Sequence, residues 1–322
     1  MGLLERKRID RAQRRRKKRI QMTIGAICAV ALVLVVGLVW KPWKYIPTGT
    51  KVETGENKDK KSKKEIRQGI IDEAKRLELS YAYDEAITHL KTVDKYEKDE
   101  EVLAMIEAIK ETKADCVPVK LEEVTHIFYH SLVVDQERAF GDASDPQTAG
   151  NLQWMTTVDE FNAITKEMYD RGFVMVSIHD LYDVTTDENG KEVWKPAEIL
   201  LPKGKKAFVL SLDDLSYYHS YEGYGYANRL IINDEGKVVN EYIDADGKMQ
   251  IGAYDCVPLM DAFVEKYPDA SYKGAKGIIA LTGYNGVLGY RTDVTYDYSH
   301  QDCDRHQKKW MDAHPDFDLE NE

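Results

Sequence analysis

The stretch "KKAFVLSLDDLSYY", residues 205–218, places an apolar run directly before two carboxylates. Residues 207–212 show little alternation with polar side chains, which predicts a strand that is buried on both faces, as in a parallel sheet. Asp213 and Asp214 would then lie at the carboxyl end of that strand, where α/β folds present their functional groups. The alternative for an arbitrary Asp-Asp pair is a turn or a helix cap.

Further strands and helices alternate on both sides of this stretch. Thr157-x-x-Glu160 forms a capping box that opens one helix, and Gly172 closes it. A second helix has Pro258 near its start and Pro268 just past its end. The alternation predicts an α/β fold of parallel βα units. Strands are expected at 124–132, 173–178, 205–212 and 276–284, and helices at 156–172 and 257–268.

Two stretches interrupt this alternation. Asn189-Gly190 is a hairpin turn signal between two short runs. Residues 224–255 contain three alternating runs separated by the turns "DEG" and "DADG". They predict a small antiparallel sheet, inserted between the third strand and the helix that follows it.

The N-terminal part has the pattern of a membrane anchor. Residues 1–19 hold ten Lys and Arg against Glu5 and Asp10, and residues 20–40 contain no charge. Twenty-one residues of helix span roughly 30 Å, the thickness of a bilayer's hydrocarbon core. We therefore predict a cytoplasmic tail (1–19), a transmembrane signal anchor (20–40) and a linker (41–62), with the rest of the chain outside the cell membrane.

Residues 63–113 have apolar side chains at helical spacing and predict three short helices, broken near 80–84 and 97–99. "AKRLELSYAYDEAITHL" resembles one tetratricopeptide unit, which would provide a surface for a protein partner. One unit does not bury its own apolar face. A helical stalk that packs on the next domain, residues 120–322, is therefore the simpler expectation.

Composition limits the class of protein. The 322 residues are 43% hydrophobic, which suits a globular chain. The whole chain carries a charge of −11 and residues 1–19 carry +8, so residues 20–322 carry −19. An acidic body of this kind excludes nucleic acid as the expected partner. Outside the predicted span there are three cysteines, which form neither a disulfide framework nor a CxxC metal knuckle.

Four segments in order resemble the NodB-type polysaccharide deacetylase domain, carbohydrate esterase family 4. These are "HIFYHSLVVD", "QWMTTVDEFNAITKEMYDRGFVMVSIHDLYD", "KKAFVLSLDDLSYY" and "DAFVEKYPDASYKGAKGIIAL", which lie within residues 120–290. The resemblance implies a distorted (β/α) barrel, here partial and with an antiparallel insertion. It also implies removal of acetyl groups from amino sugars of a cell-wall polysaccharide. Asp213 would be the general base, and Asp214 would bind a divalent metal, usually zinc.

The sequence departs from the family in two places. Leu215 stands where the family has a glycine after the Asp pair, and no His-Ser/Thr-x-x-His motif follows. His126 and His130 lie on a predicted strand, where residues i and i+4 are about 13 Å apart, so the pair is not expected to bind one ion together. His300, Cys303 and His306 remain a second candidate metal group. The acidic end "PDFDLENE" resembles a first helical turn, so we expect the chain to stop before the histidine motif.

Tyr284 and Tyr290 in "GYNGVLGYRTD", residues 283–293, are candidate sugar-binding residues at the end of the fourth strand. A non-catalytic surface protein that binds carbohydrate or acts as a scaffold is the alternative function. A sugar-cleaving hydrolase is a weaker alternative, because adjacent residues rarely hold two carboxylates roughly 5 to 9 Å apart across a bond. The chain is an enzyme, a hydrolase of amide bonds, only if further metal ligands are supplied.

Overall fold

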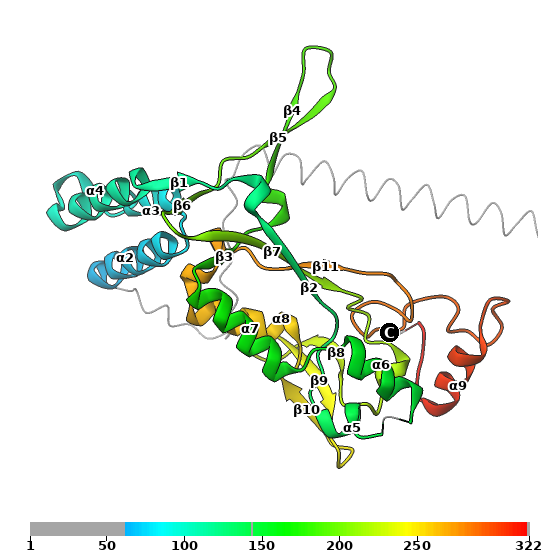
Figure 1. Ribbon diagram of the computed structural model, residues 1–322. Helices are drawn as coiled ribbons and strands as arrows, with labels where there is room; N and C mark the ends of the chain where they lie inside the picture. The colour runs from blue at the N-terminus through cyan, green and yellow to red at the C-terminus, as the bar shows by residue number, and fades with distance from the viewer. Residues whose placement is uncertain (1–61, 143, 321–322) are drawn as a thin grey trace, which may run out of the picture. The chain divides into compact units, whose positions relative to one another are not determined.

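A computed structural model describes residues 62–142 and 144–320, and a four-stranded parallel sheet lies at its centre (Figure 1). The strand β7 is the longest in this sheet and pairs with each of the other three. Residues 207–212 of β7 are all buried, as the apolar run predicted. The strands are β2 (Thr125–Tyr129), β3 (Phe173–Met175), β7 (Lys206–Asp213) and β11 (Ile278–Ala280).

The register of the sheet brings the strand ends together. On one edge of β7, Tyr129 of β2 pairs with Leu212. On the other edge, β3 pairs with the start of β7 and β11 with its end, where Ala280 lies opposite Asp213. Because all four strands run the same way, the residues that follow β2, β7 and β11 meet at one edge. The predicted parallel α/β arrangement is confirmed, but the sheet does not close into a barrel within the described ranges.

Two helices form the main cover of the sheet. Phe161 of α7 and Met260 of α8 pack with Tyr129 and Phe208 in one hydrophobic cluster. The predicted capping box at Thr157 and Glu160 is present. Two short helices that the sequence did not predict lie between β2 and α7. The helices are α5 (Gln136–Phe140), α6 (Pro146–Trp154), α7 (Val158–Asp170) and α8 (Cys256–Lys266).

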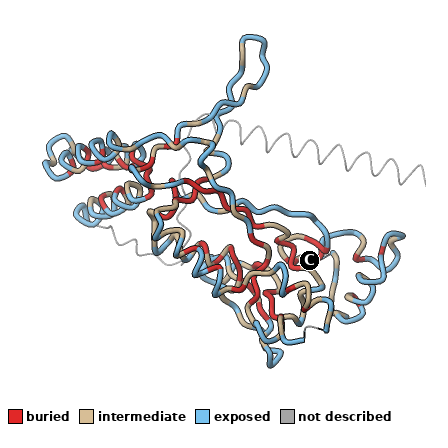
Figure 2. Tube along the Cα trace, viewed as in Figure 1, coloured by how far each residue is buried: buried red, intermediate tan, exposed pale blue. Residues whose placement is uncertain are grey.

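Both predicted antiparallel insertions are confirmed. The strands β8 (Ala227–Ile232), β9 (Val238–Ile243) and β10 (Met249–Gly252) form the three-stranded sheet between β7 and α8. The hairpin of β4 (Tyr182–Thr186) and β5 (Glu192–Pro196) turns through Gly190, whose φ is +79°. Figure 2 shows this hairpin as an exposed projection.

The three predicted helices of the N-terminal segment are α2 (Lys63–Leu79), α3 (Tyr83–Leu90) and α4 (Glu100–Ala114). Leu90 and Ile109 belong to the same buried cluster as Val174 of β3 and Val209 of β7. The Tyr81 hydroxyl donates to the Asp269 carbonyl at 2.7 Å. A short antiparallel pair, β1 (Cys116–Pro118) with β6 (Leu200–Pro202), follows the helices. This helical segment therefore shares its core with the parallel sheet.

The C-terminal part contains one α-helix, α9 (Arg305–Ala313). Residues 315–320 form turns, so the predicted first turn of a further helix is wrong there: an acidic start alone does not nucleate a helix. The short 3-10 helices are η1 (Tyr96–Lys98), η2 (Leu121–Glu123), η3 (Ile178–Asp180), η4 (His219–Tyr221), η5 (Pro268–Ala270) and η6 (Tyr272–Gly274).

The predicted transmembrane span, residues 20–40, lies outside the described residues. In the part of the chain that the structure describes, no helix combines the length and apolar character needed to cross a bilayer.

Candidate functional site

The carboxyl end of β7 turns sharply at the two aspartates. Asp213 is the last residue of the strand, and Asp214 adopts the left-handed conformation with a φ of +53°. The Ser216 amide then donates to the Asp214 carbonyl at 2.6 Å, and Tyr217 is also left-handed, with a φ of +51°. Non-glycine residues with such angles carry a conformational cost that the surrounding structure must offset, a feature that concentrates at functional sites.

Groups from the ends of β2 and β11 lie beside this turn. His130 follows β2, and its Nε2 lies 3.8 Å from Oδ2 of Asp214; both side chains are about one-third exposed. Thr282 follows β11, and its Oγ1 is 3.1 Å from the Tyr218 hydroxyl. Burial raises the pKa of Tyr218, the Thr282 hydrogen bond opposes that rise, and the Asp214 carboxylate adds to it. The end of β2 therefore brings an imidazole to the Asp214 carboxylate, and the end of β11 brings a hydroxyl to the Tyr218 phenol.

Arg291 stabilises the turn through hydrogen bonds to its backbone carbonyls. This residue is almost fully buried, and its guanidinium donates to the carbonyls of Ser216, Tyr217 and Asn285 at distances of 2.7 to 3.2 Å. It also contacts the Glu222 carboxylate at 3.4 Å. A planar guanidinium with several donors suits this role, because one side chain satisfies carbonyls from two loops.

A second carboxylate, Asp255, is fully buried behind the same edge. Its Oδ1 caps α8 by accepting from the Cys256 amide at 2.7 Å, and it accepts from Leu132, which follows β2, at 3.1 Å. No described group meets the geometry of a hydrogen bond to its Oδ2, but the nearby Tyr217 hydroxyl favours the charged form of this carboxylate. Burial raises the pKa of Asp255 to about 6, although the two amide hydrogen bonds favour the charged form.

The sequence-predicted site residues have different positions. Asp213 and Asp214 lie at the sheet edge as expected, and Tyr284 is an exposed residue on the loop that follows β11. Tyr290 lies elsewhere: its ring packs against the Arg229 guanidinium, whose carbon is 5.2 Å from the ring centroid. Tyr290 therefore packs its loop against β8.

The predicted metal ligands are incomplete within residues 62–142 and 144–320. In these ranges no three His, Cys, Asp or Glu side chains converge as an ion-binding group. His126 bonds to the Ser211 hydroxyl at 3.0 Å, so it is separate from His130, as the strand spacing predicted. The His300 Nδ1 accepts from the Asp302 amide, and the sulfur of Cys303 is buried. Asp214 and His130 are thus the two described side chains placed as candidate ligands of one ion.

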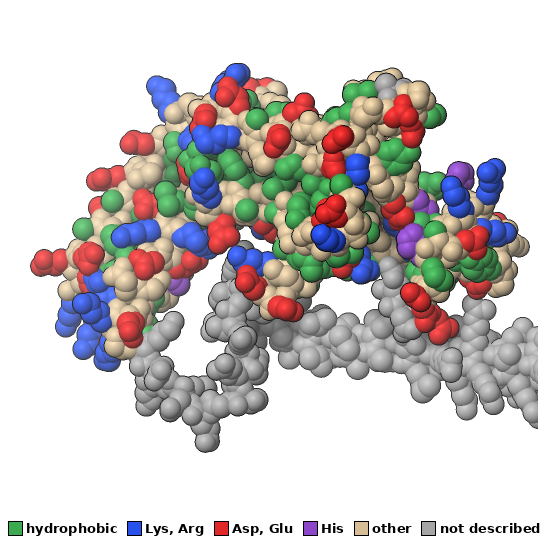
Figure 3. Space-filling model, turned by 90° about the horizontal axis from the view of Figure 1, so that it is seen from below, with side chains coloured by type: hydrophobic (Ala, Val, Ile, Leu, Met, Phe, Trp, Pro, Cys, Tyr) green, Lys and Arg blue, Asp and Glu red, His purple; other side chains and the backbone are tan. Residues whose placement is uncertain are grey.

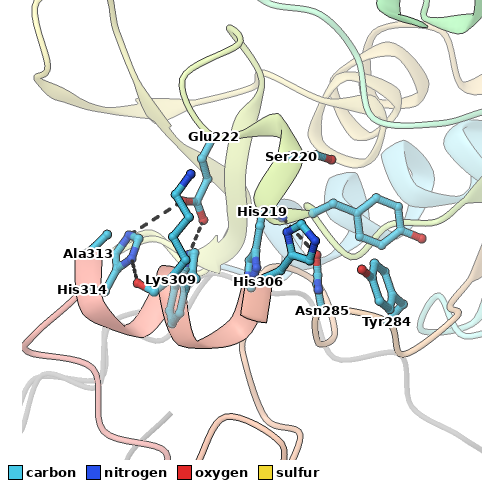
Figure 4. A pocket seen from close by; sticks show the side chains of 11 residues that line it. His219, Ser220, Glu222, Tyr284, Asn285, His306, Lys309, Ala313 and His314 are labelled. Carbon is cyan, nitrogen blue, oxygen red and sulfur yellow. Dashed lines mark hydrogen bonds and ion pairs between the residues drawn. The ribbon is translucent and has the colours of Figure 1, made fainter. Parts of the chain in front are cut away.

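A cavity of about 470 Å³ lies beside this edge, and Tyr218 is part of its wall. The η4 segment, the loop after β11 and the helix α9 enclose it (Figure 4). Trp310 of α9 stacks on His219 and on His314, with ring centroids 5.0 and 4.1 Å apart. The lining residues are Tyr218, His219, Ser220, Glu222, Tyr284, Asn285, His306, Lys309, Trp310, Ala313 and His314.

The sequence reasoning missed the contribution of α9 to this cavity. His306, Trp310 and His314 follow one another at intervals of four residues, which is the spacing of one helix face. This interval is a signal that the sequence carries, although the polar run 298–322, which lacks strand character, also fits an exposed loop and helix.

Comparisons of the chain with protein-family models, with curated proteins and with solved structures found no match.

Proposed function

We propose that this chain is a membrane-anchored, extracytoplasmic polysaccharide deacetylase-like protein that hydrolyses acetyl groups on the amino sugars of a cell-wall polymer. The observation that carries the proposal is the end of β7. Asp213 and Asp214 follow the central strand of a parallel sheet, in a turn with two left-handed residues and with His130 at 3.8 Å from Asp214. Supporting this placement is the resemblance of residues 120–290 to the NodB-type domain.

The proposed reaction is hydrolysis of an amide. A water molecule adds to the acetyl carbonyl, the carbon–nitrogen bond breaks, and acetate and a free amine form. In this proposal Asp213 accepts the proton of the attacking water and the amine nitrogen receives a proton as it leaves. Asp214 is the proposed metal ligand, with His130 beside it. A divalent metal, when bound, makes water more acidic and polarises the carbonyl. Two side chains do not complete such a site, so the proposal requires that further ligands be supplied.

The experiment uses the full chain, an N-acetylglucosamine oligosaccharide and added zinc, and it measures acetate release and bound zinc. For Asp213→Asn we expect unchanged zinc binding and at least a hundredfold loss of rate, because the base is gone. For Asp214→Asn we expect loss of both. Asp246→Asn, an exposed aspartate in the turn between β9 and β10, is the matched control and should behave as wild type.

Two results would contradict the proposal. If the wild-type chain releases no acetate with zinc present, deacetylation is not its activity. If Asp213→Asn hydrolyses at the wild-type rate, Asp213 is not the base.

The alternative function is a non-catalytic surface protein that binds carbohydrate or acts as a scaffold. Two observations favour it: Leu215 replaces the glycine of the family motif, and the described residues bring together only two candidate metal ligands. The same experiment separates the two functions, since this alternative predicts oligosaccharide binding without acetate release.

A further inference from the structure

The cavity between η4, the loop after β11 and α9 shares one residue, Tyr218, with the surroundings of Asp214. This residue lines the cavity, bonds to Thr282, and is close enough to Asp214 for that carboxylate to raise its pKa. A volume of about 470 Å³ lies within the range of small-molecule sites. A ligand in this cavity would therefore lie next to the groups proposed for hydrolysis.

The carboxylate in the cavity wall already has three partners. Glu222 accepts from the Trp310 indole at 2.7 Å, and it lies 3.4 Å from the Arg291 guanidinium and 3.7 Å from His314. Its negative charge is thus balanced inside the protein by Arg291. Glu222 therefore does not need a cationic ligand to neutralise it.

Lys309 provides a positive charge in the same wall. It is exposed and makes no ion pair with a carboxylate in the described ranges. Figure 3 shows histidines beside Lys and Arg side chains on the part of the surface that α9 forms. The lining residues contain one lysine, Lys309, and one carboxylate, Glu222, whose charge Arg291 offsets. The exposed ammonium of Lys309 attracts anions.

His219 adds a neutral polar group to the wall. Burial, and then repulsion by Arg291, lower the pKa of His219 to about 3, so this imidazole is neutral at physiological pH. Its Nε2 is 2.7 Å from the Tyr296 hydroxyl, and its Nδ1 has no hydrogen-bond partner in the described chain. The ring of His306 is exposed beside it (Figure 4). Imidazole nitrogens of this kind pair with hydroxyl groups or with anionic oxygens.

Two tyrosine rings form the end of the cavity that is nearest the sheet. Tyr218 and Tyr284 lie edge to face, with centroids 5.5 Å apart, and Tyr284 is 59% exposed. Asn285 and Ser220 add short polar side chains beside them. Aromatic surfaces with a few fixed polar groups suit a ligand that has both apolar CH faces and hydroxyl groups.

We propose that this cavity binds a saccharide unit that carries an anionic group, either a carboxylate or a phosphate. Lys309 and His306 contact the anionic oxygens, while Tyr218 and Tyr284 contact the sugar ring. The inference rests on the proposed function for the choice of a saccharide. The preference for an anion rests on the cavity itself. The site would then favour polymer units that carry a negative charge next to the acetyl group that is hydrolysed.

The test measures binding to the full chain by isothermal titration calorimetry, without added metal. The probes are an N-acetylglucosamine disaccharide, the same disaccharide with a lactyl carboxylate on one ring, and N-acetylglucosamine 6-phosphate. We expect the carboxylated disaccharide to bind about tenfold more tightly than the neutral one, because a charged contact is added. Comparing the carboxylated and phosphorylated probes identifies which anion the site prefers.

Lys309→Gln should abolish this tenfold preference and leave the affinity for the neutral disaccharide unchanged. The matched control is Lys308→Gln, which removes an exposed charge from the same helix but not from the cavity wall. Equal affinity of the wild type for neutral and anionic probes would overturn the inference. Equal losses in both lysine variants would also overturn it, because they would indicate general charge attraction.

The outcome of this test is independent of whether the proposed function is correct. Asp214→Asn should keep the preference for the anionic probe, since binding here requires neither the metal nor hydrolysis. A chain that releases acetate yet shows no charge preference refutes the inference alone. A chain that shows the preference and releases no acetate refutes the hydrolase proposal alone.

Discussion

At the scale of single residues, the candidate site contains backbone conformations and a buried carboxylate that are unfavourable in isolation. Asp214 and Tyr217 have left-handed backbones, and Asp255 is a carboxylate without exposure to water. Asp255 links the end of β2 to the start of α8, since its Oδ1 accepts from both Leu132 and Cys256. The loss of this link would affect the position of His130, which lies two residues before Leu132.

The buried Asp255 predicts a specific dependence of stability on pH. Its pKa is about 6 in the folded protein, above the usual value of 3.8, so the folded state binds the proton more tightly than the unfolded state. The stabilisation that comes from this tighter proton binding is therefore fully present below about pH 4 and is lost as the pH rises through 6. This shift corresponds to about 3 kcal/mol. The neighbouring Tyr217 and Cys256 do not titrate in this range, because burial raises the pKa of both.

Asp255→Asn removes the titration and keeps a capping oxygen. We expect the free energy of unfolding, measured with urea from pH 4 to pH 8, to fall by about 3 kcal/mol less in this variant than in the wild type. The control is Asp246→Asn, an exposed change that should follow the wild-type profile. Parallel profiles for wild type and Asp255→Asn would show that this carboxylate does not titrate on unfolding.

At the scale of elements, the loop after β11 organises the turn after β7. The Leu288 amide donates to the Leu215 carbonyl at 3.1 Å, and Arg291 from the same loop donates to Ser216 and Tyr217. Gly289 is required where this loop crosses β8: its φ is +96°, and an added Cβ would lie 2.2 Å from the Cβ of Arg229. The segment "GYNGVLGYRTD" is thus a structural brace as well as part of the cavity wall.

Arg291→Met tests this brace. The change removes the hydrogen bonds to three carbonyls and the positive charge beside Glu222. We therefore expect a loss of about 3 kcal/mol in the free energy of unfolding, measured with urea. Arg291→Lys should recover part of the loss, since it keeps the charge but not the planar fork. Arg305→Met, an exposed change at the start of α9, is the control. A loss for Arg291→Met that equals the control's would contradict the bracing role.

At the scale of the whole molecule, the helical segment and the sheet form one folded unit. Leu90 and Ile109 pack in the same cluster as Val174 and Val209, and Lys273 pairs with Glu85 at 2.8 Å. Residues 74–90, which resemble one tetratricopeptide unit, therefore do not need a second unit to bury their apolar face. The neighbour that buries the apolar face of these helices is the parallel sheet, through residues of β3 and β7.

The predicted orientation in the membrane is also a property of the whole chain. If residues 20–40 span the bilayer with the basic tail inside, a protease added to intact cells will digest the chain beyond residue 50. Immunoblotting with an antibody against the C-terminal part measures this. An antibody against residues 1–19 in unpermeabilised and permeabilised cells provides the control. Full protection of the C-terminal part in intact cells would refute the orientation.

The sequence by itself determined the parallel strands, their order along the chain, both antiparallel insertions and the helix caps. These features depend on local periodicity, turn residues and capping side chains, which are readable over a few neighbouring positions. It also predicted that Asp213 and Asp214 lie at a strand end, because a strand end is a local feature. It did not predict the contact between Tyr290 and Arg229, which are sixty-one positions apart in the sequence, and sugar binding by Tyr290 stays a prediction.

Only the tertiary structure decided which side chains meet. The approach of His130 to Asp214, the buried Arg291 brace and the cavity wall formed by α9 join segments that are far apart along the chain. Such contacts depend on strand register and on helix packing, which no local pattern specifies. The left-handed backbone at Asp214 is likewise visible only in the structure, because aspartate tolerates this conformation without requiring it.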